Sequence, residues 1–98
     1  MNNTNENNKI ITEFMGNPTI FNPIHDANLY QIKEQSNMTY YIDELQYNTS
    51  WDWLMPVVHK CRQQNRLEYF DFVYYAIEMC DINVTYKAVL EFIKNQNK

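Results

Sequence analysis

The side chains of this sequence best suited to bind a metal ion are His25, His59, Cys61 and Cys80. A structural zinc site requires paired ligands, typically two cysteines separated by about two to four residues, and the sequence contains no such pair. His59 and Cys61 are two positions apart, so on a helix their side chains point about 200° from each other. We therefore expect no metal site, a histidine at the surface, and two reduced cysteines buried as small apolar side chains.

The groups that could catalyse a reaction do not form a recognisable constellation. Cys61 with either histidine would supply a nucleophile and a base, but no strained turn or glycine exposes the thiol. Asp43 and Glu44 are adjacent carboxylates, and neighbouring residues of a strand face opposite sides of the sheet. The only glycine is Gly16, which excludes a glycine-rich phosphate-binding loop. We predict that the protein is not an enzyme and binds no cofactor.

The composition indicates one small globular domain. Of its 98 residues, 45% are hydrophobic and 15% aromatic, which suffices for one core and is too much for a disordered chain. Twelve acidic residues outnumber eight scattered basic ones, so direct binding of nucleic acid is disfavoured. No segment approaches the roughly 20 apolar residues of a membrane span, and the N-terminus has no secretory signal. We expect a cytoplasmic protein without membrane contact.

The N-terminal half is expected to contain one helix and a hairpin. Residues 1–8 are expected to form a disordered polar tail, and residues 9–98 a single domain. This domain is expected to open with a short helix that ends at Gly16. Two prolines predict an irregular connection over residues 17–28. The alternation of β-branched or aromatic residues with polar ones then predicts a β-hairpin, whose strands lie within residues 29–34 and 38–47.

A helix is predicted from residue 49 to about residue 65. Its apolar stripe is Trp51, Leu54, Val58 and Cys61. Thr49 and Asp52 have the spacing of a capping box at its start. Pro56 then lies inside the helix, removes one backbone hydrogen bond and is expected to kink it. This geometry would place both indoles, Trp51 and Trp53, against the core.

The segment 66–80 is rich in aromatic residues, which is typical of strands, but its acidic residues recur on one face of a helix, and we predict a helix. The expected buried face is Tyr69, Phe70, Val73, Ala76, Ile77 and Cys80. The acidic stripe is either simply the solvated side or an anionic face that docks on a basic groove. The surplus of aromatic area predicts a binding patch or an oligomer interface. The predicted partner-binding residues are Glu68, Asp71, Phe72, Tyr74, Tyr75, Glu78 and Asp81.

The C-terminal segment predicts an amphipathic helix that begins after Asp81, a favourable N-cap. Apolar residues recur from Ile82 at i+4, i+7 and i+11, and lysines line the opposite side. The expected fold is therefore a small α+β domain of about four helices packed on a β-hairpin or a small antiparallel sheet.

Three blocks of the sequence carry a family resemblance: IITEFMG (10–16), NTSWDWLMPVV (48–58) and TYKAVLEFIKNQN (85–97). They resemble the small phage and prophage proteins of the phage ABA-sandwich domain family. The resemblance implies an α+β domain from a mobile element of a bacterial host, and it implies no activity. The sequence departs from the family in segment 66–80, where strands would be expected, and in lacking an aromatic pair after Lys94. The sheet is therefore expected to be smaller than in relatives.

The leading hypothesis is a non-enzymatic phage or prophage protein that binds a host protein or a protein–RNA effector complex. Its expected role is inhibition of a host defence system, such as an anti-CRISPR or other anti-defence role, in the cytoplasm of the bacterial host. One alternative is a small-molecule or nucleotide sponge, although few basic residues are available to bind phosphates. The other alternative is a homo-oligomeric structural accessory protein.

Overall fold

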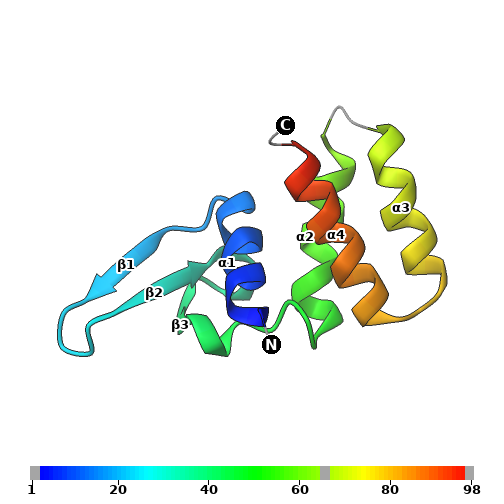
Figure 1. Ribbon diagram of the computed structural model, residues 1–98. Coiled ribbons are helices and arrows are strands. Elements are labelled where there is room, and N and C mark those ends of the chain that lie inside the picture. Colours follow the sequence, from blue (N-terminus) through cyan, green and yellow to red (C-terminus); the bar gives the residue numbers. More distant parts are fainter. Residues whose placement is uncertain (1–2, 65–66, 97–98) are drawn as a thin grey trace.

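A computed structural model describes residues 3–64 and 67–96, without the side chains of residues 67–69. In chain order the main elements are α1 (Thr4–Phe14), β1 (Thr19–Asn22), β2 (Ala27–Ile32), β3 (Met38–Tyr41), α2 (Trp51–Arg62), α3 (Leu67–Glu78) and α4 (Ile82–Gln96). This arrangement confirms the expected α+β class. Helices α2, α3 and α4 pack together on one side of the molecule, and α1 lies between them and the sheet (Figure 1).

Helix α1 corrects the prediction of a disordered tail over residues 1–8 from Thr4 onward, and residues 1 and 2 lie outside the described residues. The helix begins at Thr4, and Asn8 is only 1% exposed. The side-chain amide of Asn8 donates to the carbonyl of Leu45 at 3.2 Å, and its oxygen accepts from the hydroxyl of Tyr86 at 2.8 Å. An asparagine-rich segment lacks the apolar periodicity by which a buried helix is predicted. Buried hydrogen bonds anchor this segment instead.

The C-terminal end of α1 is tied to α2. Gly16 has a φ of 73°, in the left-handed region that favours glycine, and ends the helix as predicted. The ammonium of Lys60 donates to the carbonyl of Phe14 at 2.6 Å and lies 5.1 Å from the centre of the Phe14 ring. A cation at a helix C-terminus also opposes the negative end of the helix dipole.

The sheet has the order β1-β2-β3, and both neighbouring pairs are antiparallel. The predicted hairpin is confirmed by β2 and β3, which pair Tyr30 with Tyr40. Strand β1 corrects the prediction that residues 17–28 form an irregular connection. Three of its four residues are exposed, so no alternation of buried and polar positions marks it in the sequence. The β1–β2 hairpin projects away from the helices (Figure 1) and exposes Phe21 and Ile24.

Strand β3 is shorter than the predicted run over residues 38–47. It ends at Tyr41, whose amide donates to the carboxylate of Glu44 at 2.8 Å. Residues 42–44 therefore turn as one short 3₁₀ helix, which leads the chain toward α2. Local carboxylate capping of this kind competes with strand pairing.

Helix α2 begins one residue later than predicted. The carbonyl of Gln46 accepts the amides of both Thr49 and Ser50, so Thr49 belongs to a turn and Ser50 is the N-cap. The expected capping box between Thr49 and Asp52 does not form, because no side-chain hydrogen bond caps this helix. Pro56 lies inside α2, and the helix continues past it to Arg62.

The two tryptophans have different environments, contrary to the expectation that both pack against the core. Trp53 is 5% exposed and lies edge-on to the rings of Tyr40 and Tyr47, at centroid distances of 5.0 and 5.3 Å. Trp51, in the first turn of α2, is 36% exposed. The apolar stripe begins in effect at Trp53 and Leu54.

Helices α3 and α4 form an antiparallel pair at the side of the molecule farthest from the sheet (Figure 1). The helical prediction for segment 66–80 is confirmed over Leu67–Glu78, whereas residues 79–80 form a turn and residue 66 lies outside the described residues. The carboxylate of Asp81 accepts the amides of Asn83 and Val84 at 2.9 and 3.2 Å, which confirms Asp81 as the N-cap of α4. Cys80 precedes it with a φ of 56° and is exposed, so the prediction that Cys80 is buried is wrong. The chain turns there, and the helical face does not continue to Cys80.

Candidate functional site

Helix α3 exposes more aromatic area than any other described helix of the molecule. Phe72 is 62% exposed, Tyr75 64% and Met79 66%, and Tyr74 beside them is 53% exposed. The inward side of the same helix is packed, because Val73 and Ala76 are buried and Phe70 and Ile77 are partly buried against the core. Large apolar side chains gathered on one exposed helix face are typical of an interaction surface. We call these four exposed residues the α3 surface.

Part of the α3 surface forms one wall of a groove between α3 and α4. The groove has a volume of about 460 Å³ and is lined by Phe72, Tyr75, Ala76, Met79, Val84, Lys87, Ala88, Glu91 and Asn95. Its α4 wall follows the spacing i, i+4, i+7 and i+11 from Val84, a second stripe beside the one that faces the core. Tyr74 does not line the groove, although its ring lies edge-on to that of Tyr75 at 6.1 Å.

The charges differ between the two helices that flank this groove. Helix α3 contains no lysine or arginine in its sequence, and its Asp71 and Glu78 are both exposed outside the groove lining. The α4 wall carries Lys87 and Glu91, which are four residues apart and of opposite sign. The α3 side is therefore the more negative of the two, which complements a basic partner.

The structure describes six of the seven predicted partner-binding residues as exposed: Asp71, Phe72, Tyr74, Tyr75, Glu78 and Asp81. The side chain of Glu68 lies outside the described residues. Asp81 has a structural role as well, because its carboxylate caps α4. Sequence reasoning missed Met79, Val84 and Ala88. The signal available for the last two was their i, i+4 spacing on the side of α4 away from the core stripe.

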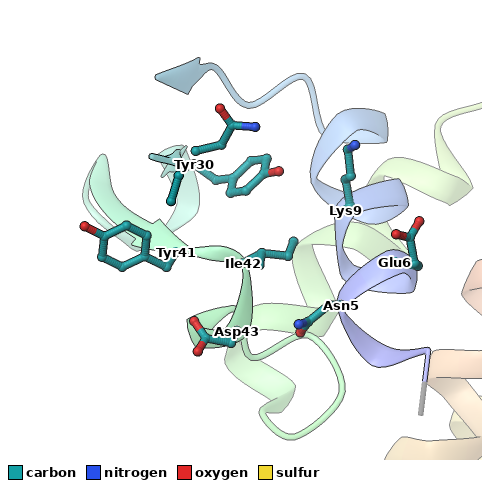
Figure 2. A pocket seen from close by; sticks show the side chains of 9 residues that line it. Asn5, Glu6, Lys9, Tyr30, Tyr41, Ile42 and Asp43 are labelled. Atoms are coloured by element: carbon teal, nitrogen blue, oxygen red, sulfur yellow. The ribbon is translucent and has the colours of Figure 1, made fainter. Parts of the chain in front are cut away.

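A second cavity lies between α1 and the sheet and has a volume of about 640 Å³. Figure 2 shows Tyr30 pointing toward Lys9 of α1, whereas Tyr41 points away from that helix. Of the two rings in its lining, Tyr30 is buried and Tyr41 is half-buried, so neither offers a fully exposed face on which a base could stack. Its lining has one ammonium, from Lys9, beside the carboxylates of Glu6 and Asp43. That balance of charge is poorly suited to a phosphate.

Among the described residues, three groups with strongly shifted pKa values lie in the core. Burial raises the pKa of Cys61 to about 12, so its sulfur stays a thiol at neutral pH and is a poor nucleophile. Burial also raises the pKa values of Tyr47 and Tyr86 to about 12. In Tyr47 hydrogen bonds from Thr12 and Asn17 oppose that rise. The two hydroxyls are parts of hydrogen-bonded contacts that hold α1 in place.

In the part of the chain that the structure describes, no group of three or more histidine, cysteine or acidic side chains is placed to hold a metal ion. Among the described helices, none combines the length and the apolar character needed to cross a membrane.

The α3 surface and the groove beside it are therefore the best candidate for a functional site. They combine exposed aromatic rings, a hollow between two helices and a negative rim. Comparison of the chain with protein-family models, with curated proteins and with solved structures found no match.

Proposed function

We propose that this protein acts by binding another protein through the α3 surface and that it catalyses no reaction. The observation that carries the proposal is the exposure of Phe72, Tyr74 and Tyr75 on one short helix and of Met79 directly after its end. Tyrosine and phenylalanine supply large contact areas with few rotatable bonds, which makes them frequent anchors of interfaces. Exposing them to water has no benefit for folding, so a partner that covers them explains their place.

The role proposed for this binding is inhibition of a host defence system by a phage or prophage protein. Support comes from the three sequence blocks that resemble phage ABA-sandwich proteins and from the carboxylates of Asp71 and Glu78 beside the rings. A protein–RNA effector complex has basic channels for phosphates, and a negative protein face competes for such a channel. The protein would act in the cytoplasm of the bacterial host.

The test is affinity capture from a bacterial lysate, compared between the wild type and a variant of the α3 surface. We expect the wild type to retain one dominant protein, and the variant Phe72→Ala/Tyr75→Ala to lose it. The retained protein is then purified, and the affinity of the two-component complex is measured by calorimetry. Phe21→Ala is the matched control, because it removes an equally exposed ring on the β1–β2 hairpin.

The role in defence is tested separately, by the survival of phage in a host whose defence system is active. Expression of the wild type should raise survival, and expression of the Phe72→Ala/Tyr75→Ala variant should not. Retention of no protein by the wild type, or of the same protein by both forms, would overturn binding through the α3 surface. Capture without any effect on phage survival would leave the interaction and reject the role in defence.

A further inference from the structure

We propose that the groove between α3 and α4 receives one amphipathic helix of the partner, with lysine or arginine along the edge that lies over α3. The inference rests on the proposed function and names the class of segment that would be bound. It adds to the α3 surface the α4 wall of the groove, with Val84, Ala88, Glu91 and Asn95.

The shape of the groove fits a helix. Each wall is formed mainly by a helix and presents a stripe at helical spacing: Phe72 and Tyr75 on α3 with Met79 directly after its end, and Val84, Ala88, Glu91 and Asn95 on α4. The α4 stripe spans eleven residues, or about 16 Å along the axis, which matches three turns of a bound helix. Ala76 and Ala88 are the small residues of the lining, and small side chains allow two helices to approach closely.

The polarity of the groove requires an apolar stripe on the bound helix. The larger side chains of the α3 wall are Phe72, Tyr75 and Met79, and Met adapts its shape to irregular surfaces. A helix with apolar residues at i, i+3 or i+4 and i+7 would fill the space between these rings and α4. Its apolar residues would remove from water the most exposed side chains of α3.

The charge pattern selects the edge of that helix. Asp71 and Glu78 lie on α3, whose sequence has no basic residue to neutralise them, whereas Lys87 and Glu91 on α4 balance each other. A lysine or arginine edge on the α3 side would pair with these two exposed carboxylates. A second copy of α3 in the groove would bring further carboxylates there, so the charges disfavour self-association.

The experiment uses three synthetic helical peptides of about 16 residues, long enough to span the groove. All three are fluorescently labelled and have capped ends. The first has a leucine stripe at i, i+3, i+7 and i+10 with lysines along one edge, the second has glutamates in place of the lysines, and the third is a scrambled form of the first. Binding to the full chain is measured by fluorescence anisotropy at low salt.

We expect the lysine-edged peptide to bind at least roughly tenfold more tightly than the other two. Tyr75→Ala should weaken its binding roughly tenfold, since an interface tyrosine in a pocket commonly has an effect of that size. Phe21→Ala is the matched control, because Phe21 is a similarly exposed ring that lies on the β1–β2 hairpin and does not line the groove; its effect should stay within about twofold. Asp71→Lys/Glu78→Lys should reverse the preference toward the glutamate-edged peptide.

Three results would overturn the proposal. The first is equal binding, or no binding, of the lysine-edged and scrambled peptides. The second is an equal loss of binding in Phe21→Ala and Tyr75→Ala. The third is a concentration-dependent dimer in light scattering that Tyr75→Ala abolishes, because the occupant would then be a second copy. The proposed function can survive such a result. If the Phe72→Ala/Tyr75→Ala variant still fails to capture the partner from the lysate, binding through the α3 surface stands and only the bound helix is rejected.

Discussion

A polar residue is buried at the junction of α1 with α4, whereas aromatic residues are exposed on the outer side of α3. At the junction, the polar side chain of Asn8 is buried and hydrogen-bonded to Leu45 and Tyr86. On α3, Phe72 and Tyr75 are more than half exposed. Burying a polar group is tolerated only when its hydrogen bonds are made, and exposing an aromatic ring contributes nothing to folding. The comparison therefore separates the part of the molecule that maintains the fold from the part that is free to bind.

The strongest test of this separation is a pair of phenylalanine substitutions. Phe92 is 2% exposed and lies edge-on to Phe70, so Phe92→Ala should lower the free energy of unfolding by about 3–5 kcal/mol. Phe72→Ala should change it by less than about 0.5 kcal/mol, because Phe72 is exposed. Urea denaturation followed by circular dichroism measures both. If Phe92→Ala does not fold, Phe92→Leu should still show a loss of about 1 kcal/mol. Equal losses for the two alanine variants would contradict the separation.

The pH dependence of stability tests the buried side of the comparison. Desolvation raises the pKa of Tyr47 from 10.0 to about 12, and the negative charge of Glu34 adds to this rise. The folded state holds the phenol proton more tightly than the unfolded state does. The stabilisation of about 2–3 kcal/mol is thus fully present below pH 10 and is lost as the pH rises to about 12. Chemical denaturation between pH 8 and pH 12 measures this.

Tyr47→Phe provides the control for that titration. At pH 8 the variant should be less stable than the wild type, because Asn17 loses its hydrogen bond to the phenol oxygen. As the pH rises, the wild type should lose this advantage, since only the wild type has a phenol to ionise in the core. A constant difference between the two proteins from pH 8 to pH 12 would show that Tyr47 is not responsible.

Asn8 should matter more than its place near the N-terminus indicates. Asn8→Ala leaves the Leu45 carbonyl and the Tyr86 hydroxyl without this partner, and should lower the free energy of unfolding by about 2 kcal/mol. Tyr86→Phe should cost about 1 kcal/mol. The loss in the double variant should be smaller than the sum of the single losses, since both remove the same bond. Asn5→Ala, at an exposed position of α1, is the control; strict additivity would show that the two side chains do not interact.

The smallest predicted change in stability is that of substituting Asp81. This residue caps α4 and is also one of the predicted partner-binding residues. Asp81→Ala should reduce stability by about 1 kcal/mol, because the amides of Asn83 and Val84 lose their cap. Asp81→Asn keeps an oxygen at the same place and should be nearly neutral for stability. Thr49→Ala should have little effect, since Thr49 does not cap α2. Thermal denaturation of the three variants checks the order, and a larger loss in Thr49→Ala would reverse it.

The sequence was most informative where apolar spacing and capping act together. The start of α4 after Asp81 and the helical state of α3 were predictable, because local hydrogen bonds and one-sided burial determine both. Strand β1 was not predictable, since pairing with β2 rather than its own pattern makes it a strand. The helical start of α1 was missed because Asn8 is buried against Tyr86, which lies 78 residues away in the sequence.

The candidate site was predictable in part. The aromatic surplus of segment 66–80 correctly indicated which side chains of α3 would be exposed, because one helix face buries only a limited number of rings. The groove was not predictable, since it depends on how α3 and α4 lie against each other. A single sequence gives the stripe on each helix, and it does not give the distance between the stripes.

The contact between Asn8 and Tyr86 also bears on the order of events during synthesis. The ribosome releases α1 and the sheet first, and α4 last. Until Tyr86 has emerged, the side-chain oxygen of Asn8 has no phenol hydroxyl from which to accept a hydrogen bond. Helix α1 also lacks the helix against which it packs. The nascent domain would therefore remain open through most of translation and close in a late step that joins the first helix to the last.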